Sequence, residues 1–266
     1  MMSNSRVAMV KALFFDIDGT LVSFNTHRIP DSTVEALRQA KANGVKVYIS
    51  TGRPKPFINN LGQIADLIDG YITTTGALCM VGDEAFGRFS IDPNDAKRVM
   101  DACYELGKSC VVVGTKHISL INDSAELTRL FREGLNLDYE FAPLDVTLKE
   151  PLLQLSPFFT HEEEVALMGQ LVSCVSSRWH PAFTDITHRD ADKGKAMVAM
   201  CQHEGFDVAD TMAFGDGGND IPIIQKAGIG VAMGNAVDMV KAVADHVTSS
   251  VDDEGVSNAL RFFHVI

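Results

Sequence analysis

The first 75 residues alternate short apolar runs with a helix-like stretch, and this rhythm restricts the possible folds more than any other feature. Residues 31–43 carry apolar positions at helical spacing, with Asp31 or Ser32 as the expected N-cap and Gly44 at the end. Pro54 suits the first turn of a second helix. The apolar runs of strand length are 11–15, 45–50 and 71–74. Such a β-α-β-α-β order is typical of a parallel sheet with helices on both faces.

The same rhythm returns near Asp190, whereas the middle of the chain lacks it. Near the C-terminus we expect strands at 211–214, 229–232 and 246–247, separated by helices. In the middle we expect strands at 85–90, 152–155, 176–179 and 184–187, a hairpin over 109–121, and helices at 92–106, at 123–132 and after a capping box at 160–163. The predicted division is a doubly wound α/β core from 1–82 and 188–266, interrupted by an inserted α+β domain at 83–187.

Two acidic residues follow the first strand directly. Asp16 and Asp18 lie two positions apart, and at a strand end this spacing points both side chains roughly the same way. Carboxylates this close repel each other, so we expect a proton or a cation between them. A shared cation would make Asp16 a shielded nucleophile and leave Asp18 free for proton transfer. The plain alternative is a polar turn that ends the strand at Gly19.

Three further stretches place acidic or anion-binding residues at strand-to-helix junctions. They are Ile49-Ser50-Thr51-Gly52-Arg53, Asp192-Lys193-Gly194-Lys195 and Gly215-Asp216-Gly217-Gly218-Asn219-Asp220. Each alone would fit a turn, a helix cap or a solvated lysine. Together, and in this order with the first stretch, they favour a site at the carboxyl ends of the strands.

The four stretches resemble the four motifs of haloacid-dehalogenase (HAD) superfamily phosphatases, and 221–235 continues in the pattern of the Cof-type (subfamily IIB) branch. The resemblance covers nearly the whole chain. It implies a Rossmann-like core with an inserted cap domain, and a Mg²⁺-dependent phosphatase acting on small phosphate monoesters, chiefly sugar phosphates. The insert would then be the cap that selects the substrate.

The resemblance also assigns roles that phosphate chemistry requires. A catalyst must align a nucleophile, neutralise charge and protonate the leaving oxygen. Asp16 would be the nucleophile that forms an aspartyl-phosphate, and Asp18 the general acid and then the base. Mg²⁺ would take the carboxylates of Asp16 and Asp216 and the backbone carbonyl of Asp18. Asp220 would be a water-mediated ligand or a partner for Lys193.

The remaining motif residues would contact the substrate. Arg53 would reach the substrate or form a structural ion pair, and both alternatives stay open. This chain has Thr75-Gly76-Ala77 where Cof-type chains often have Asn-Gly-Ala. Either the Thr75 hydroxyl replaces the amide of that Asn, or the substrate contact of that Asn is not carried over, and both alternatives stay open. The expected phosphoryl-binding residues are Thr51, Gly52, Lys193 and Asn219.

Charge and cysteine content exclude several other classes of protein. The formal net charge is −12 and no Lys/Arg-rich block is present, which argues against nucleic acid or an anionic membrane as the partner. The five cysteines are widely spaced without a CxxC pair, which disfavours disulfide frameworks and zinc sites and fits a reducing cytosol. No leader or membrane-spanning run is evident, so we expect a soluble, cytoplasmic protein.

Two other functions fit the same residues. A phosphomutase or other phosphotransferase would share the site and pass the phosphoryl group to a sugar hydroxyl. A catalytically silent, phospho-accepting binding protein would use an acidic pocket on the same kind of sheet. The sequence leaves the oligomeric state open.

Overall fold

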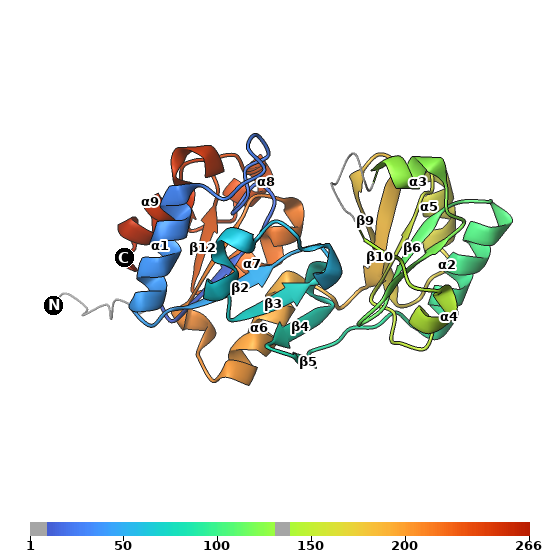
Figure 1. The fold of residues 1–266 in the computed structure, drawn as a ribbon, viewed down its shortest axis with the longest axis horizontal. Coiled ribbons are helices and arrows are strands. Elements are labelled where there is room, and N and C mark those ends of the chain that lie inside the picture. The colour runs from blue at the N-terminus through green and yellow to red at the C-terminus, as the bar shows by residue number, and fades with distance from the viewer. Residues whose placement is uncertain (1–9, 131–138) are drawn as a thin grey trace. The chain divides into compact units, whose positions relative to one another are not determined.

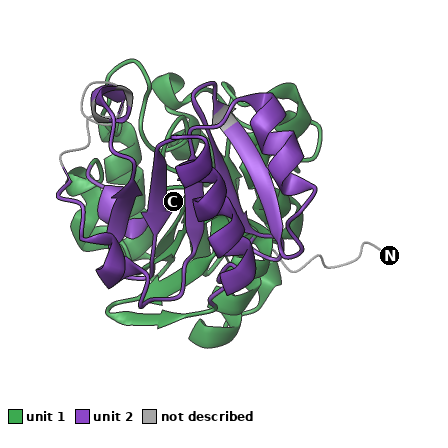
Figure 2. Ribbon diagram, turned by 90° about the vertical axis from the view of Figure 1, so that its right-hand side faces the viewer, with its two compact units in different colours: residues 1–53, 60–87, 192–266 green, residues 54–59, 88–191 purple. Residues whose placement is uncertain are grey.

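The computed structural model describes residues 10–130 and 139–266, and the chain divides into two compact units (Figures 1 and 2). Unit 1 takes in the chain up to Arg53 together with 60–87 and 192–266. Unit 2 takes in 54–59 and 88–191. Within the described ranges, no helix is both long enough and apolar enough to cross a lipid bilayer.

Unit 1 is built on an eight-stranded sheet in the order β13-β12-β11-β1-β2-β3-β4-β5. The six strands from β13 to β3 are parallel, and β4 and β5 extend the sheet as antiparallel strands. The strands are β1 (Ala12–Phe15), β2 (Lys46–Ser50), β3 (Gly70–Thr73), β4 (Leu78–Val81), β5 (Glu84–Phe86), β11 (Thr211–Gly215), β12 (Ile229–Ala232) and β13 (His246–Val247). Because β2 and β11 flank β1 on opposite sides, the strand order reverses at β1, where ligands of such sheets bind.

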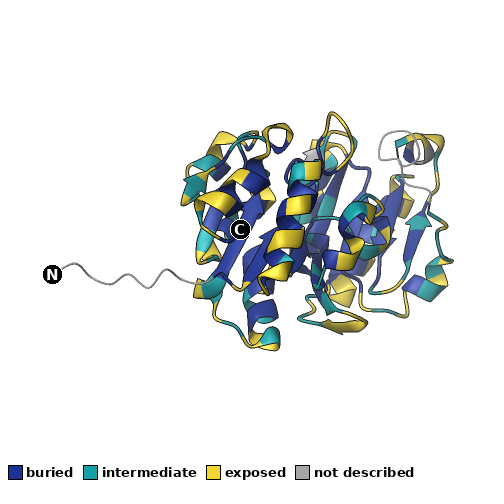
Figure 3. Ribbon diagram, turned by 60° about the vertical axis from the view of Figure 1, so that its left-hand side comes forward, coloured by how far each residue is buried: buried dark blue, intermediate teal, exposed yellow. Residues whose placement is uncertain are grey.

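Helices cover both faces of this sheet. Successive residues of a strand point to opposite faces, and because both sets are apolar here, both faces have to be buried. Phe14 faces the side where α6 and α7 bury Met197, Met200 and Ile223. Phe15, one residue on, points the other way and stacks on Phe214 at 4.7 Å between ring centroids. Helices α1 and α9 pack together, each with one buried side; Figure 3 colours buried residues dark blue and exposed ones yellow. The helices are α1 (Asp31–Ala42), α6 (Lys193–Glu204), α7 (Ile221–Lys226), α8 (Asp238–Lys241) and α9 (Gly255–Phe262).

Unit 2 is a five-stranded antiparallel sheet in the order β7-β6-β8-β10-β9. Helices α2 and α5 pack on one face, where Val99 and Leu167 meet Leu155. On the other face, Phe57 joins Val111 and other apolar side chains. The elements are α2 (Pro93–Glu105), β6 (Cys110–Val113), β7 (Ile118–Ile121), α3 (Ala125–Arg129), α4 (Leu144–Thr147), β8 (Gln154–Pro157), α5 (His161–Met168), β9 (Cys174–His180) and β10 (Phe183–His188).

The predicted fold class is confirmed: an α/β core sheet and a separate, antiparallel insert sheet. The predicted capping box is also present, because Thr160 Oγ1 accepts from Glu163 N and Glu163 Oε2 accepts from Thr160 N. The N-cap prediction for α1 is wrong. Pro30 occupies that position without a side-chain hydrogen bond, and Asp31 is the first helical residue.

The unit boundaries fall a few residues after those expected from the sequence. The turn at 82–83 was expected to begin the insert, but it joins β4 to β5, and β5 pairs with β4 in the core sheet. The strand expected at 85–90 is therefore the short edge strand β5. The helix expected at 123–132 is α3, and the end of the expected range lies outside the described residues.

Candidate active site

The parallel register of unit 1 brings the sequence motifs together at one edge of the sheet. Phe15, the last residue of β1, lies opposite Ile49 of β2 and Phe214 of β11. The residues that follow these strands therefore leave the sheet side by side, since parallel strands end at the same edge. Asp16, Thr51 and Asp216 are among those residues, and the backbone N–H of Asp16 still donates to Phe214 O at 3.1 Å.

Lys193 links two of the carboxylates in the interior. It is the first residue of α6, and its side chain is fully buried. Its Nζ lies 2.6 Å from Asp16 Oδ1 and 2.6 Å from Asp220 Oδ1. Burial by itself lowers the pKa of Lys193, but the charges of Asp16 and Asp220 outweigh it and hold that pKa above its ordinary value. Lys193 is therefore a fixed positive charge in the site.

Negative charge is still in excess around this lysine. Burial, offset in part by Lys193 and reinforced by Asp220, raises the pKa of Asp16 to about 8. Burial also raises the pKa of Asp216 to about 6, although a hydrogen bond from Thr20 Oγ1 at 2.8 Å opposes the shift. The protein alone therefore supplies too little positive charge to stabilise both carboxylates as anions.

Asp220 acts on the loop that precedes it. Its Oδ2 accepts hydrogen bonds from the backbone N–H groups of Asp216 and Gly217, each at 3.0 Å, while its Oδ1 is held by Lys193. Both oxygens therefore have protein partners, and the side chain fixes the conformation of the Asp216 loop. This arrangement matches the expected pairing of Asp220 with Lys193.

Asp18 and Arg53 form a bidentate ion pair. Arg53 Nε and one terminal nitrogen of its guanidinium donate to the two oxygens of Asp18, each at 2.8 Å. Of the two alternatives for Arg53, the structure shows the ion pair, and a substrate contact stays a prediction. The pair orients the Asp18 carboxylate, and both side chains are only partly buried.

Neutral polar groups surround Gly52, in the loop that follows β2. Thr51 Oγ1 accepts from the backbone N–H of Arg53 at 3.1 Å, which leaves the hydroxyl proton of Thr51 available to another acceptor. Next to it, the Asn219 amide and the Thr75 hydroxyl flank Gly52: each lies 3.5 Å from the point where a Cβ on Gly52 would stand. The four predicted phosphoryl-binding residues thus belong to one region of unit 1.

Comparison with known proteins decides the family. A model of haloacid dehalogenase-like hydrolases matches residues 13–260. The chain belongs to this family. It is a HAD-type phosphatase, similar to YkrA of Bacillus subtilis, with 31% identity over 94% of this chain and 96% of the relative. It is also 27% identical, over 95% of each chain, to the B. subtilis 5-amino-6-(5-phospho-D-ribitylamino)uracil phosphatase YcsE.

Two solved structures match this HAD phosphatase over nearly their whole lengths. The HAD subclass IIB sugar phosphatase BT4131 is 43% identical, with a TM-score of 0.88 and coverage of 97% of this chain and 100% of that one. The HAD phosphatase BT1666 from Bacteroides thetaiotaomicron is 31% identical, with a TM-score of 0.86 and coverage of 100% and 99%. The Cof-type resemblance inferred from the motifs is confirmed.

The HAD family implies a metal, and the donor set of this chain fits a hard divalent cation. Asp16, Asp216 and Asp220 each offer a carboxylate oxygen, and the three atoms lie within 4.8 Å of one another. Burial and neighbouring carboxylates raise the pKa values of Asp16 and Asp216, and a bound cation would stabilise both carboxylates as anions. Because both Asp220 oxygens already have partners, Asp16 and Asp216 stay the expected carboxylate ligands, with the Asp18 carbonyl as the third.

Two residues that support the site were given no role from the sequence. Thr20 donates to Asp216 and so connects the first motif to the last. Asn235 Nδ2 donates to Gly19 O at 2.8 Å, and its Oδ1 accepts from Val251 N at 2.9 Å, which anchors the turn after Asp18. Thr20 directly follows Gly19 and Asn235 ends the stretch 221–235, but only the folded chain shows which loop each one holds.

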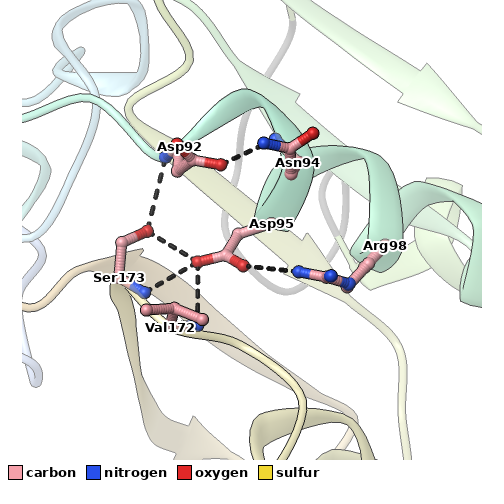
Figure 4. A pocket seen from close by; sticks show the side chains of 6 residues that line it. All are labelled: Asp92, Asn94, Asp95, Arg98, Val172 and Ser173. Atoms are coloured by element: carbon pink, nitrogen blue, oxygen red, sulfur yellow. Dashed lines mark hydrogen bonds and ion pairs between the residues drawn. The ribbon is translucent and has the colours of Figure 1, made fainter.

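Unit 2 of the HAD phosphatase contains a separate open pocket of about 370 Å³ (Figure 4). Its polar groups satisfy one another. Asp95 Oδ2 accepts from Val172 N, Ser173 N and Ser173 Oγ at 2.7 to 3.0 Å, and Oδ1 lies 3.3 Å from Arg98. This network ties the start of α2 to the 172–173 turn, and the acidic group found among the described residues that could hold a metal lies elsewhere, in unit 1.

Proposed function

We propose that the protein is a Mg²⁺-dependent phosphatase of small phosphate monoesters, chiefly sugar phosphates, and that it works through an aspartyl-phosphate. The observation that carries the proposal is the Asp16–Lys193–Asp220 group. It holds one carboxylate next to a fixed ammonium at the carboxyl edge of the sheet, with Asp216 beside it. A bound Mg²⁺ would neutralise phosphoryl oxygens and hold Asp16 and the substrate in line.

The chain's own groups account for the rest of the reaction. An Asp16 oxygen attacks phosphorus, and the bond from phosphorus to the ester oxygen breaks. Asp18 gives its proton to the departing alkoxide. Asp18 then takes a proton from water as that water attacks the phosphorus of the aspartyl-phosphate, which releases inorganic phosphate and restores Asp16. Lys193, Thr51 and Asn219 neutralise and orient the phosphoryl oxygens.

A similar enzyme supports sugar phosphates as the substrate class. The sugar phosphatase BT4131 shares 43% of its residues with this chain. The net charge of −12 repels anions at long range, so capture depends on local groups such as Lys193. Unit 2, the counterpart of the insert expected at 83–187, would act as the cap that selects among leaving groups.

The test is phosphate release from a panel of monoesters by the native protein, Asp16→Asn and Asp95→Asn. The panel spans hexose phosphates, pentose phosphates, nucleotides, flavin mononucleotide and pyridoxal phosphate. We expect release with Mg²⁺, loss of release with a chelator, and a fall of at least about 10³-fold in Asp16→Asn, because the nucleophile is lost. Asp95→Asn removes a buried carboxylate from unit 2 and should leave the rate unchanged.

Normal turnover by Asp16→Asn would refute the proposal. Product analysis separates hydrolysis from transfer, since a phosphomutase would yield an isomeric sugar phosphate in place of inorganic phosphate. A stable aspartyl-phosphate without turnover would identify the silent binding protein instead.

A further inference from the structure

Two consecutive threonines after β3 have a backbone conformation that β-branched residues rarely adopt. Thr74 has φ of 53° and Thr75 has φ of 54°, both in the left-handed region. Such a conformation costs free energy and persists only where the surroundings enforce it, which is most often at a functional site. The pair therefore calls for an explanation within the site.

The surroundings that enforce this conformation belong to the site itself. Thr74 N donates to Arg53 O and Thr75 N donates to Thr51 O, each at 3.1 Å. Gly76 follows at φ of 94°, and a Cβ there would stand 2.4 Å from Asp192 O. The strained turn is thus held between the Thr51–Arg53 loop and the residue that precedes Lys193.

The hydroxyls of Thr74 and Thr75 have different surroundings. Thr74 Oγ1 is buried and has no hydrogen-bond partner among the described residues. The Thr75 side chain is half-buried, and its Oγ1 lies beside Gly52 together with Asn219 Nδ2. Within 10–130 and 139–266, neither Oγ1 of Thr75 nor Nδ2 of Asn219 takes part in a hydrogen bond that would compete with a ligand.

We propose that Thr75 is a further substrate-binding residue, whose hydroxyl donates a hydrogen bond to an oxygen of the phosphoryl group. The inference rests on the proposed phosphatase function and deepens it. Thr75, Asn219 and the Thr51 hydroxyl are neutral donors on the side of Gly52, and Lys193 is the charged one. A phosphoryl group has three oxygens in need of donors, and Gly52 has no side chain to stand between them.

The experiment compares Thr75→Val with Thr75→Ser and Thr74→Val. Valine keeps the β-branch and the volume of threonine and removes only the hydroxyl, so both valine variants place the same demand on the strained backbone. We expect Thr75→Val to lower kcat/KM by about 10- to 100-fold, the usual effect of losing one hydrogen bond to a charged group. Thr75→Ser keeps the donor and should stay within about threefold of the native enzyme.

Thr74→Val is the matched control. Its hydroxyl is buried without a partner, so kcat/KM should be unchanged and the unfolding temperature should not fall. Thermal unfolding of all three variants establishes that each is folded. Equal kinetics for Thr75→Val and Thr74→Val would overturn the proposal.

Inhibition by inorganic phosphate gives a readout that does not depend on the leaving group. A contact with the phosphoryl group predicts that Thr75→Val weakens phosphate inhibition and lowers kcat/KM by a similar factor for every monoester. A loss confined to some esters, with phosphate inhibition intact, would place Thr75 against the leaving group and overturn the proposal. If the native protein releases no phosphate at all, the proposed function fails. If the native protein releases phosphate and Thr75→Val has the same kcat/KM, only this inference fails.

Discussion

The carboxylates buried in unit 1 and those buried in unit 2 are paired in opposite ways. In unit 1, Asp16 shares the single ammonium of Lys193 with Asp220. In unit 2, Asp95 accepts hydrogen bonds from Val172 N, from the N–H and hydroxyl of Ser173, and from Arg98. Glu164 of unit 2 likewise accepts from Arg178 and, at 3.1 Å, from Thr184.

Their pKa values shift in opposite directions as a result. Burial raises the pKa of Asp16 to about 8, and the positive charge of Lys193 only partly offsets this effect. Burial also raises the pKa of Asp95, but the hydrogen bonds from Ser173 and Val172 outweigh it and the net pKa lies below the ordinary 3.8. The pKa of Glu164 is lowered for the same reason, by Ser176, Arg178 and Thr184.

This difference separates a site from a scaffold. A buried carboxylate with a full set of donors stabilises the fold, whereas one with too few donors costs stability and is retained for binding or catalysis. If this contrast holds, substitutions near the two kinds of carboxylate should have different effects on stability and on catalysis.

Lys193→Met should have the largest effect on stability, because it removes the one cation that Asp16 and Asp220 share within residues 10–130 and 139–266. We expect the free energy of unfolding in metal-free buffer to fall by about 3–5 kcal/mol at neutral pH, together with a loss of phosphate release. Urea unfolding measures the first effect and phosphate release the second. Arg178→Met in unit 2 is the counterpart: it should destabilise the protein but leave the kinetics of the folded enzyme unchanged.

Mg²⁺ should stabilise the native protein through unit 1. At a Mg²⁺ concentration of 100 Kd, the free energy of unfolding should rise by about 2.7 kcal/mol. Asp216→Asn removes an expected ligand and should abolish most of this gain, while Asp95→Asn should retain it. A full Mg²⁺ effect on the unfolding midpoint of Asp216→Asn would refute the assignment of Asp216.

Asp95→Asn should have a smaller effect that depends on pH. We expect a loss of about 1–3 kcal/mol near pH 7, since the buried N–H groups of Val172 and Ser173 lose a charged acceptor. The folded-state pKa of Asp95 lies below 3.8, so its contribution is complete above that pH and is lost as the pH falls through the folded value. The native and variant proteins should therefore converge in urea unfolding only below about pH 3.8. A difference that stays constant down to the lowest pH would contradict this account.

Much of the core fold could be predicted because its signals are local. Apolar runs of strand length alternate with helical spacing, and polar residues at the strand ends meet when parallel strands pair in register. The place of β4 and β5 in the core sheet was harder to predict. A two-residue turn at 82–83 can close a hairpin within one sheet, but it can equally separate two domains. The difference between these outcomes is a tertiary pairing.

The same limit applied to the site. The motif positions of Asp16, Lys193 and Asp216 could be located from the sequence, because the residue types and their junctions were sufficient. The sequence drew attention to Thr75 only as a departure from Asn-Gly-Ala; the role proposed for it rests on a backbone φ of 54° and on the nearness of Gly52. No pattern of residue types records a backbone angle at a threonine.

Phe57 makes the core of unit 2 depend on a segment outside the contiguous range 88–191. It belongs to the short segment 54–59, yet its ring is buried in unit 2, with ring centroids 5.4 Å from Tyr139 and 6.4 Å from Phe141. A gene fragment coding for 88–191 alone would omit this ring, a loss of the kind that costs about 3–5 kcal/mol in a core. Recombination that exchanged only that contiguous fragment between homologous genes would thus separate the insert from part of its own interior, so a working transplant would need a second crossover around 54–59.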